Sequence, residues 1–320
     1  MNKPFLLSPS GKDYIWGGNR INEEFVKNLN VFPLAESWEC SVHEAGLSFV
    51  ASGEYKGMSL KAVLEKHPDY LGQKHNQFPI LVKLIDANED LSIQVHPDDI
   101  FAKDENDNGK TEMWSILDAA KGTKIIYGLR EKYNEKEIRS AINDNTILEK
   151  LQKIEIKKND VFFIEPGTVH AIGAGALIAE IQESSNLTYR LYDYNRIDKN
   201  GKKRELHIDK AMRVLNFNPS DKPRQPMRVL KYENGVAREL LARCRYFEVY
   251  RMLLNNERRQ KVFYSADSLS FRVLFCIDGC GVISFVNENV LFFRGDCFFV
   301  PANSCPITLH GNAKFLDIRG

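Results

Sequence analysis

The sequence predicts a mainly β protein with a few inserted helices, and three observations support this fold class. Short runs rich in β-branched and aromatic residues recur along the chain, bounded by Asn, Asp, Gly or Pro. Helical spacing of apolar residues is confined to three short interludes. The longest segment without apolar periodicity, 218–226, separates two β-rich parts. We therefore expect two domains, 1–217 and 227–320, joined by a linker at 218–226.

The expected elements follow one another along the chain in a regular way. Strands of the first part are expected at 79–87, 91–96, 123–129, 153–158 and 161–166. The second part repeats the pattern, with strands expected at 246–254, 270–279, 281–286, 289–301 and 313–318. Helices are expected at 59–72, which starts with a capping Ser and ends with Gly, at 134–152 and at 208–217.

Composition excludes several classes of function. The 44 Lys and Arg and the 43 Asp and Glu are spread through the 320 residues, for a net charge of +1, so we expect no nucleic-acid or membrane-surface partner. The N-terminal apolar stretch is short and interrupted by Ser and Pro, and no run approaches the ~18 apolar residues of a membrane span. The 6 cysteines fall partly in apolar runs and are expected to be reduced. These features predict a cytoplasmic enzyme or binding protein. For its assembly we expect a monomer or a homodimer.

The stretch LSIQVHPDD, 91–99, places an amide and an imidazole two positions apart in an alternating apolar run. Because side chains of a strand alternate between its faces, Gln94 and His96 are expected on one face. Leu91, Ile93 and Val95 are then expected on the other. One wall of the sheet would therefore carry two polar side chains that can bind a metal ion.

Two further stretches supply residues of the same kind. GKTEMW places Glu112 at the start of a strand or loop, and NDVFFIEPGTVHAIG ends a strand in a Pro-Gly turn followed by His170. With Gln94 and His96 these make two imidazoles, one carboxylate and one amide oxygen, a plausible set of four ligands for a divalent ion. The mixture is most consistent with zinc, although cobalt, nickel or manganese would also be accommodated. Because structural zinc sites favour Cys, the set is more typical of a catalytic site.

Several motifs, in chain order, resemble a known family. The strand followed by PGTVH resembles the second motif of cupin barrels, whose turn delivers a histidine to a metal inside the barrel. The motifs YIWGG, AESWECS, IQVHPDD, KTEMW, EPGTVHAIGAG and SNLTYRLYDYNR together resemble the short bacterial mannose-6-phosphate isomerases, from about residue 5 to the end. The resemblance implies two cupin-type, jelly-roll β-barrels, the second of them degenerate because VPANSC stands where the first has EPGTVH. It also implies a zinc-dependent aldose–ketose isomerase that interconverts mannose 6-phosphate and fructose 6-phosphate through an enediol or enediolate.

The resemblance assigns roles to individual residues. In the family pattern one zinc ion is held by the residues that match His96, Glu112 and His170, and Gln94 matches an amide ligand of the longer relatives. Arg190 in NLTYRLYDY matches the catalytic arginine. The longer relatives carry a Glu ten residues before that arginine, a spacing that falls on Glu180.

The chemistry of such an isomerase requires a base, a cation for the enediolate oxygens and a group that holds the phosphate. Glu180 could move the proton if its pKa is suitable, and Arg190 suits developing negative charge or the substrate itself. Lys110 and Lys83 are candidate contacts of the phosphate or of a hydroxyl group. Two alternatives stay open: a cupin isomerase or epimerase of another sugar phosphate, and a sugar-binding regulatory cupin without turnover. The presence of Glu112 and Arg190 beside the complete ligand set argues against the second alternative.

Overall fold

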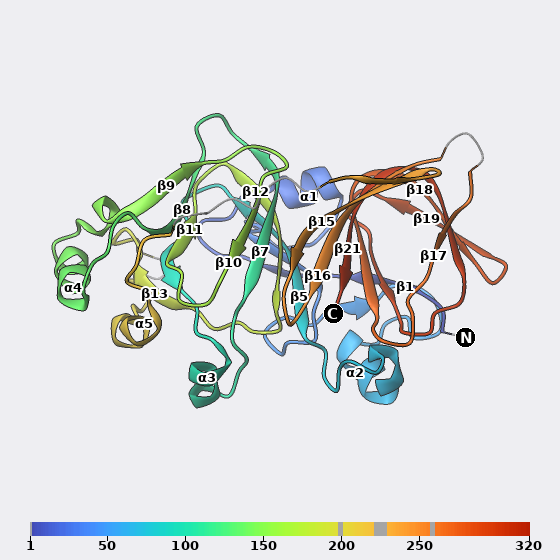
Figure 1. The fold of residues 1–320 in the computed structure, drawn as a ribbon, viewed down its shortest axis with the longest axis horizontal. Coiled ribbons are helices and arrows are strands. Elements are labelled where there is room, and N and C mark those ends of the chain that lie inside the picture. Colours follow the sequence, from blue (N-terminus) through green and yellow to red (C-terminus); the bar gives the residue numbers. More distant parts are fainter. Residues whose placement is uncertain (1, 198–200, 221–228, 257–259) are drawn as a thin grey trace.

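The computed structural model describes residues 2–197, 201–220, 229–256 and 260–320. The described chain is mainly β, as the sequence predicts, and its strands form sheets of six, five and ten strands. In Figure 1 the five-stranded sheet lies on the left, the six-stranded sheet in the middle and the ten-stranded sheet on the right. The linker predicted at 218–226 falls mostly outside the described residues.

The six-stranded sheet is the central layer of the molecule. In spatial order its strands are β10 (Val161–Ile164), β7 (Glu112–Ala119), β12 (Ala176–Glu183), β5 (Ile80–Ala87), β3 (Glu36–Cys40) and β2 (Ser10–Lys12). Every residue of β5 and β12 is buried, because both faces of this sheet are covered. Ala179 and Ile181 belong to a core cluster shared with the ten-stranded sheet, whereas Ile178 belongs to a cluster shared with the five-stranded sheet.

The five-stranded sheet carries helices on its outer face. Its strands, in spatial order, are β13 (Tyr189–Tyr192), β6 (Ile93–Val95), β11 (His170–Ile172), β8 (Lys124–Leu129) and β9 (Leu151–Glu155). Ile93 and Val95 pack in one apolar cluster with the buried faces of α4 (Glu135–Asn143) and α5 (Ile208–Val214). Since alternate residues of a strand face opposite sides, Gln94 points inward, toward the six-stranded sheet. Leu91, expected beside Ile93, instead precedes β6 and packs in the inner cluster.

The ten-stranded sheet contains most of the C-terminal part of the chain. Its main path is β14 (Lys231–Glu233), β15 (Val236–Arg243), β16 (Glu248–Asn255), β21 (Ile307–Arg319), β18 (Arg272–Phe285), β20 (Cys297–Val300), β1 (Phe5–Ser8) and β4 (Phe49–Val50). Beside this path, β17 (Val262–Tyr264) pairs with β21, and β19 (Glu288–Phe293) pairs with β18. The N-terminal strand β1 thus completes the C-terminal sheet, with Phe5 opposite Phe299.

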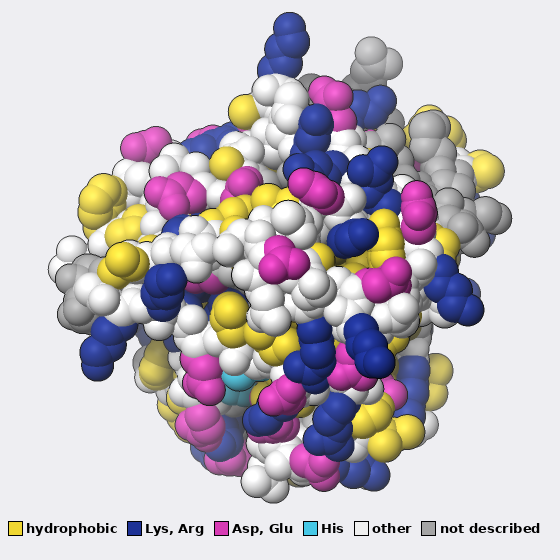
Figure 2. Space-filling view, turned by 90° about the vertical axis from the view of Figure 1, so that its left-hand side faces the viewer, with side chains coloured by type: hydrophobic (Ala, Val, Ile, Leu, Met, Phe, Trp, Pro, Cys, Tyr) yellow, Lys and Arg dark blue, Asp and Glu magenta, His cyan; other side chains and the backbone are white. Residues whose placement is uncertain are grey.

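The remaining helices are short. They are α1 (Arg20–Phe25), α2 (Leu60–Lys66), α3 (Asp99–Ala102) and the 3-10 turns Pro68–Leu71, Lys103–Glu105 and Ile147–Glu149. The Ser59 side chain caps α2 by accepting a hydrogen bond from the amide of Ala62 at 3.2 Å, as its sequence predicts. None of the helices in the described part of the chain is long and apolar enough to cross a membrane. On the face shown in Figure 2, basic and acidic side chains are interspersed.

The helix predicted over 134–152 is too long. The capping box of Asn134 and Glu137 starts α4 as expected, but the chain turns at Asn145, whose φ is +58°, and continues as β9. Ile147 and Leu151 pack in the same apolar cluster as the buried face of α4. Their four-residue spacing in the sequence therefore looks like the continuation of the helix, although the chain has already left it.

Two predictions of strand boundaries in the C-terminal part are also wrong. The runs at 270–279 and 281–286 form the single strand β18. Glycine at position 281 allows β21 to pair closely with this strand, since a Cβ there would lie 2.1 Å from the carbonyl oxygen of His310. The run at 289–301 is two strands, β19 and β20, separated by a turn at Gly295 with φ of +103°.

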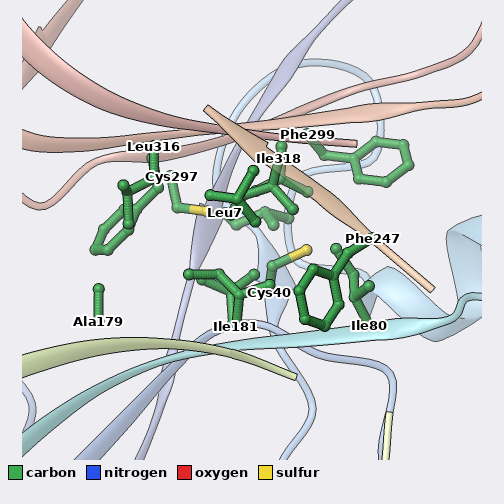
Figure 3. Packing of buried hydrophobic residues seen from close by; sticks show 14 of the residues in the cluster. Leu7, Cys40, Ile80, Ala179, Ile181, Phe247, Cys297, Phe299, Leu316 and Ile318 are labelled. Atoms are coloured by element: carbon green, nitrogen blue, oxygen red, sulfur yellow. The ribbon is translucent and has the colours of Figure 1, made fainter. Parts of the chain in front are cut away.

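The core between the central and the ten-stranded sheet joins the two parts of the chain. Figure 3 shows Ala179, Ile181 and Ile80 on one side of this core, facing Leu316 and Ile318 of β21 on the other. All five side chains belong to one buried cluster. The two parts of the chain therefore share a core and are expected to unfold together.

Leu316→Ala tests this shared core. Leu316 is fully buried, so its truncation should lower the free energy of unfolding by about 2–5 kcal/mol. Urea denaturation should show one cooperative transition at a lower midpoint. The control is Leu291→Ala in β19, whose side chain is 63% exposed and whose loss should change stability by at most about 0.5 kcal/mol. Separate transitions of the N- and C-terminal parts would contradict a shared core.

Candidate metal centre

Three predicted ligands converge between the five- and six-stranded sheets. His96 directly follows β6, His170 opens β11, and Glu112 opens β7 in the facing sheet. One ligand atom of each lies within 4.8 Å of the others, and all three side chains are buried. These are the elements that the sequence motifs predict, except that His96 lies just beyond a strand shorter than expected.

The Pro-Gly turn before His170 is held against the residue that carries the second imidazole. The amide of Gly167 donates to the carbonyl oxygen of His96 at 2.9 Å. Gly167 has φ of +85°, and an added Cβ would lie 2.7 Å from the carbonyl oxygen of Val214. The turn therefore requires glycine both for its backbone conformation and for space. Pairing of β11 with β6 then places His170 opposite Gln94.

The imidazoles present their Nε2 atoms to one point. The Nδ1 atom of His170 lies 2.8 Å from the carbonyl oxygen of Thr168, so it carries the proton and leaves the Nε2 lone pair facing inward. His170 Nε2 is 3.1 Å from His96 Nε2. Glu112 Oε1 lies 3.4 Å from His170 Nε2, and its Oε2 lies 3.5 Å from His96 Nε2. This orientation through a backbone carbonyl is typical of histidines that bind metal.

The pKa values of His96 and His170 favour the binding of a cation by these side chains. Burial lowers the pKa of His170 to about 4 and, together with the charge of Lys110, holds the pKa of His96 well below its usual value. Both imidazoles are therefore neutral near pH 7. Burial and the neighbouring charge of Glu180 raise the pKa of Glu112 to about 7. Neither oxygen of Glu112 accepts a well-formed hydrogen bond, so the donor set fits a divalent metal ion.

Gln94 lies beside the three predicted ligands, with its amide nitrogen rather than its oxygen toward His170. Its Nε2 atom is 3.3 Å from His170 Nε2. A half-turn of the amide would exchange nitrogen and oxygen, and the two orientations differ mainly in hydrogen bonding. A role for Gln94 as the fourth ligand stays a prediction.

Lys110 and Lys83 form a buried charged layer with the acidic residues. Lys110 Nζ lies 3.0 Å from Glu112 Oε2 and 3.1 Å from His96 Nε2, so its ammonium faces the predicted ligands. Lys83 Nζ lies 3.5 Å from one oxygen each of Glu36 and Glu180. Both lysines are buried, which ion pairing permits.

Glu180 is oriented by its neighbours on both sides. It lies opposite Lys83 and Trp114 in the strand register, and Trp114 Nε1 donates to its Oε2 at 2.9 Å. Although burial alone would raise the pKa of Glu180, the charges of Lys110 and Lys83 and the Trp114 hydrogen bond lower it below its usual value. Glu180 Oε1 is buried and lies 3.5 Å from Lys83 Nζ and 4.0 Å from Lys110 Nζ, without a closer hydrogen bond among the described residues.

A pocket of about 240 Å³ lies over this layer. The predicted residues that line it are Gln94, Lys83, Lys110, Glu180 and Arg190. The sequence analysis missed other polar residues of its wall, namely Tyr14, Glu36, Ser92, Asn186, Thr188 and Arg204. The motifs YIWGG, AESWECS and SNLTYRLYDYNR contain four of them, so the motifs held the signal but not the side-chain directions.

Arg190 is fixed at the wall of this pocket. Its Nε donates to Ser92 Oγ at 3.2 Å, and its Nη1 donates to the carbonyl oxygen of Glu205 at 2.9 Å. Burial and the charge of nearby Arg204 lower the pKa of Arg190, which still leaves a guanidinium charged at any physiological pH. Among the described residues, Nη2 donates no hydrogen bond, and Arg190 lines the pocket, so this nitrogen can bind an anionic group there.

A larger cavity of about 1200 Å³ lies against the ten-stranded sheet, and most of the charged side chains that line it form ion pairs within the lining. Arg272 lies 3.0 Å from Asp317, and Arg238 lies 2.8 Å from Glu233. Cys305 is buried in the apolar cluster of this sheet. In the described residues, the His96, Glu112 and His170 group is the one set of His, Cys, Asp and Glu arranged to hold a metal.

Removal of single ligands tests the metal centre. His96→Ala, Glu112→Ala and His170→Ala should each abolish or strongly weaken metal binding, because each removes one of few strong donors. Gln94→Ala should have a smaller effect, since a neutral amide is the weakest donor of the set. Elemental analysis of purified protein measures this, with His310→Ala, an exposed histidine, as the control. Full metal occupancy in His170→Ala would contradict the site.

Comparison with known proteins identifies the family of this chain. The family model of the phosphomannose isomerase type I catalytic domain matches residues 5–127, and that of the mannose-6-phosphate isomerase cupin domain matches residues 238–319. Mannose-6-phosphate isomerase of Streptococcus mutans is 35% identical over 303 residues, which cover 94% of this chain and 93% of that protein. Mannose-6-phosphate isomerase ManA of Bacillus subtilis is 35% identical over 315 residues, 98% of this chain and 97% of that protein.

Solved structures agree with this assignment. The crystal structure of the mannose 6-phosphate isomerase from Bacillus subtilis matches with a TM-score of 0.92 and 34% identity, over 99% of each chain. The apo form of the Salmonella typhimurium enzyme shares the fold, with a TM-score of 0.76 at 17% identity over 100% of each chain. The fold is thus of the cupin type, and the chain belongs to the mannose-6-phosphate isomerase family.

Proposed function

We propose that the protein is a zinc-dependent isomerase that interconverts mannose 6-phosphate and fructose 6-phosphate. The observation that carries this proposal is the buried His96, Glu112 and His170 set, which lies beneath a pocket that also exposes an ionised carboxylate and an arginine. Two neutral imidazoles and one carboxylate leave a further position for a substrate, as catalytic zinc sites do. Family membership and the sugar phosphates named for the relatives support the same substrate.

The residues of the pocket divide the chemistry between them. Zinc held by His96, Glu112 and His170 would supply a Lewis acid for the carbonyl and hydroxyl oxygens of the sugar. Glu180, ionised and oriented by Trp114, is the base that moves the proton between C1 and C2. The pairing with Lys83 keeps this carboxylate in place between turnovers.

Lys83 and Lys110 suit the reacting oxygens better than the phosphate. Both are buried and ion-paired within the charged layer, at the base of the pocket. Their ammonium groups would stabilise negative charge that develops on an enediolate oxygen. Arg190, with a free edge of its guanidinium toward the pocket, would stabilise that charge or bind the phosphate.

The alternatives are an isomerase or epimerase of another sugar phosphate and a regulatory sugar-binding protein. A regulatory protein has less need of Glu180, whose buried charge is costly to maintain. Catalysis therefore accounts for this residue better than binding alone.

We propose that residues 1–217 and 227–320 form two jelly-roll barrels, the first catalytic and the second degenerate, although β1 is paired with the second. We also propose a monomer or homodimer in the cytoplasm, a reducing compartment that suits six unpaired cysteines.

A coupled assay tests the activity and the metal together. Purified protein should convert mannose 6-phosphate to fructose 6-phosphate, lose turnover when a chelator removes the metal, and regain it with about one zinc per chain. Turnover that persists after complete removal of the metal would contradict the zinc proposal. Turnover with a different sugar phosphate alone, or binding without turnover, would favour the corresponding alternative.

Arg190→Ala and Arg190→Lys test the role of the guanidinium. Loss of one preorganised donor to developing charge should lower kcat by ~10²–10³-fold, and lysine should restore little because it lacks the planar fork. Zinc content and melting temperature should stay close to the wild-type values, since Arg190 is not a ligand. The control is Arg213→Ala on the exposed side of α5, which should leave turnover unchanged. A raised KM at unchanged kcat would assign Arg190 to phosphate binding instead.

A further inference from the structure

The segment 109–112 delivers both Lys110 and Glu112 to the metal centre, and side chains from elsewhere hold its backbone. The amide of Gly109 donates to Asp99 Oδ1 at 3.0 Å. Two residues later, the amide of Thr111 donates to Glu183 Oε1 at 2.6 Å. Two carboxyl groups therefore hold the backbone on either side of Lys110, immediately before the ligand Glu112.

The fit around this segment leaves little freedom. The amide of Lys110 donates to the carbonyl oxygen of Pro97 at 3.0 Å. The amide of Glu183 donates to the carbonyl oxygen of Thr111, also at 3.0 Å. A Cβ added at Gly109 would lie 2.6 Å from the amide nitrogen of Asp99. The segment is thus tied by hydrogen bonds on both sides, and a displacement of its anchors would displace Glu112.

One of the two anchors is connected to the C-terminal part of the chain. The hydroxyl of Tyr246 donates to the second oxygen of Asp99 at 2.7 Å, and Tyr246 lies in the turn between β15 and β16 of the ten-stranded sheet. Asp99 therefore links the ten-stranded sheet to the backbone at Gly109.

We propose that Tyr246, acting through Asp99, is a positioning residue for the metal centre, and that Glu183 is the second anchor of the same segment. The ten-stranded sheet would then do more than cover the central sheet, because it sets the position of the segment that carries Lys110 and Glu112. The role in turnover rests on the proposed isomerase function, whereas the role in metal affinity rests only on the metal centre.

Tyr246→Phe tests this proposal, because it removes one hydroxyl and keeps the ring. Partners that orient metal ligands are typically worth ~10–100-fold in metal affinity or activity. Tyr246 acts one step further away, so we expect the Kd for zinc, titrated into metal-free protein, to rise by about 3- to 10-fold. We expect kcat to fall by a similar factor with little change in KM, since Tyr246 does not line the pocket.

The matched control is Tyr264→Phe. Its hydroxyl also donates to a carboxylate, Asp317, at 2.7 Å within the ten-stranded sheet, but it has no bond to the segment 109–112. This variant should have a lower melting temperature than the wild type, with unchanged zinc affinity and kcat. Equal losses of zinc affinity in both variants would show that Tyr246 acts only through stability and would overturn the proposal.

Two substitutions at Glu183 give an independent measurement. Glu183→Gln keeps an oxygen for the Thr111 amide, so its zinc affinity should stay within about 3-fold of wild type. Glu183→Ala removes this bond, directly before Glu112, and should weaken zinc affinity more than Tyr246→Phe does. Unchanged zinc affinity in both Glu183→Ala and Tyr246→Phe would overturn the proposal. A change in zinc affinity in a protein that turns over no mannose 6-phosphate would instead support the positioning role and contradict the proposed function.

Discussion

The burial of the Glu112 carboxylate is the constraint on which the rest of the structure depends. A carboxylate removed from water costs several kcal/mol unless cations and hydrogen bonds compensate. Here both oxygens lack well-formed hydrogen bonds, and the compensation comes from the Lys110 ammonium at 3.0 Å and from the predicted metal. Such a site requires rigid walls, and two sheets facing each other provide them.

The central sheet provides such a wall, because its strand β12 contributes to the apolar core on one face and to the pocket on the other. In β12, Ala179 and Ile181 pack toward the ten-stranded sheet, while Glu180 between them belongs to the pocket. A strand held on both sides of a charged residue by close packing has little freedom to shift. Packing of the apolar face thus determines where Glu180 lies relative to His96, Glu112 and His170.

The ten-stranded sheet contributes to the site although it lines none of the pocket. Its apolar face closes the core behind Glu180, and its Tyr246 reaches Asp99, which holds the backbone at Gly109. The structure of the site therefore depends on residues separated by more than a hundred positions in the chain. Both parts of the chain thus contribute residues to the network around Glu112.

The sequence by itself determined the mainly β class, most of the strands and the residues that meet at the site. Alternation in β6, the Pro-Gly turn before His170 and the family motifs were sufficient for this, because they are local patterns with local physical causes. The same alternation explains why Gln94 faces inward while Ile93 packs under the helices.

Only the tertiary structure decided how these residues are connected. The helix over 134–152 was predicted too long because Leu151 of a strand faces the same cluster as α4, and periodicity does not distinguish the two cases. The pairing of β1 with β20, the contact of Lys110 with the ligands and the bond from Tyr246 to Asp99 join residues far apart in sequence. Such contacts depend on how the sheets pack, so no local pattern of residues predicts them.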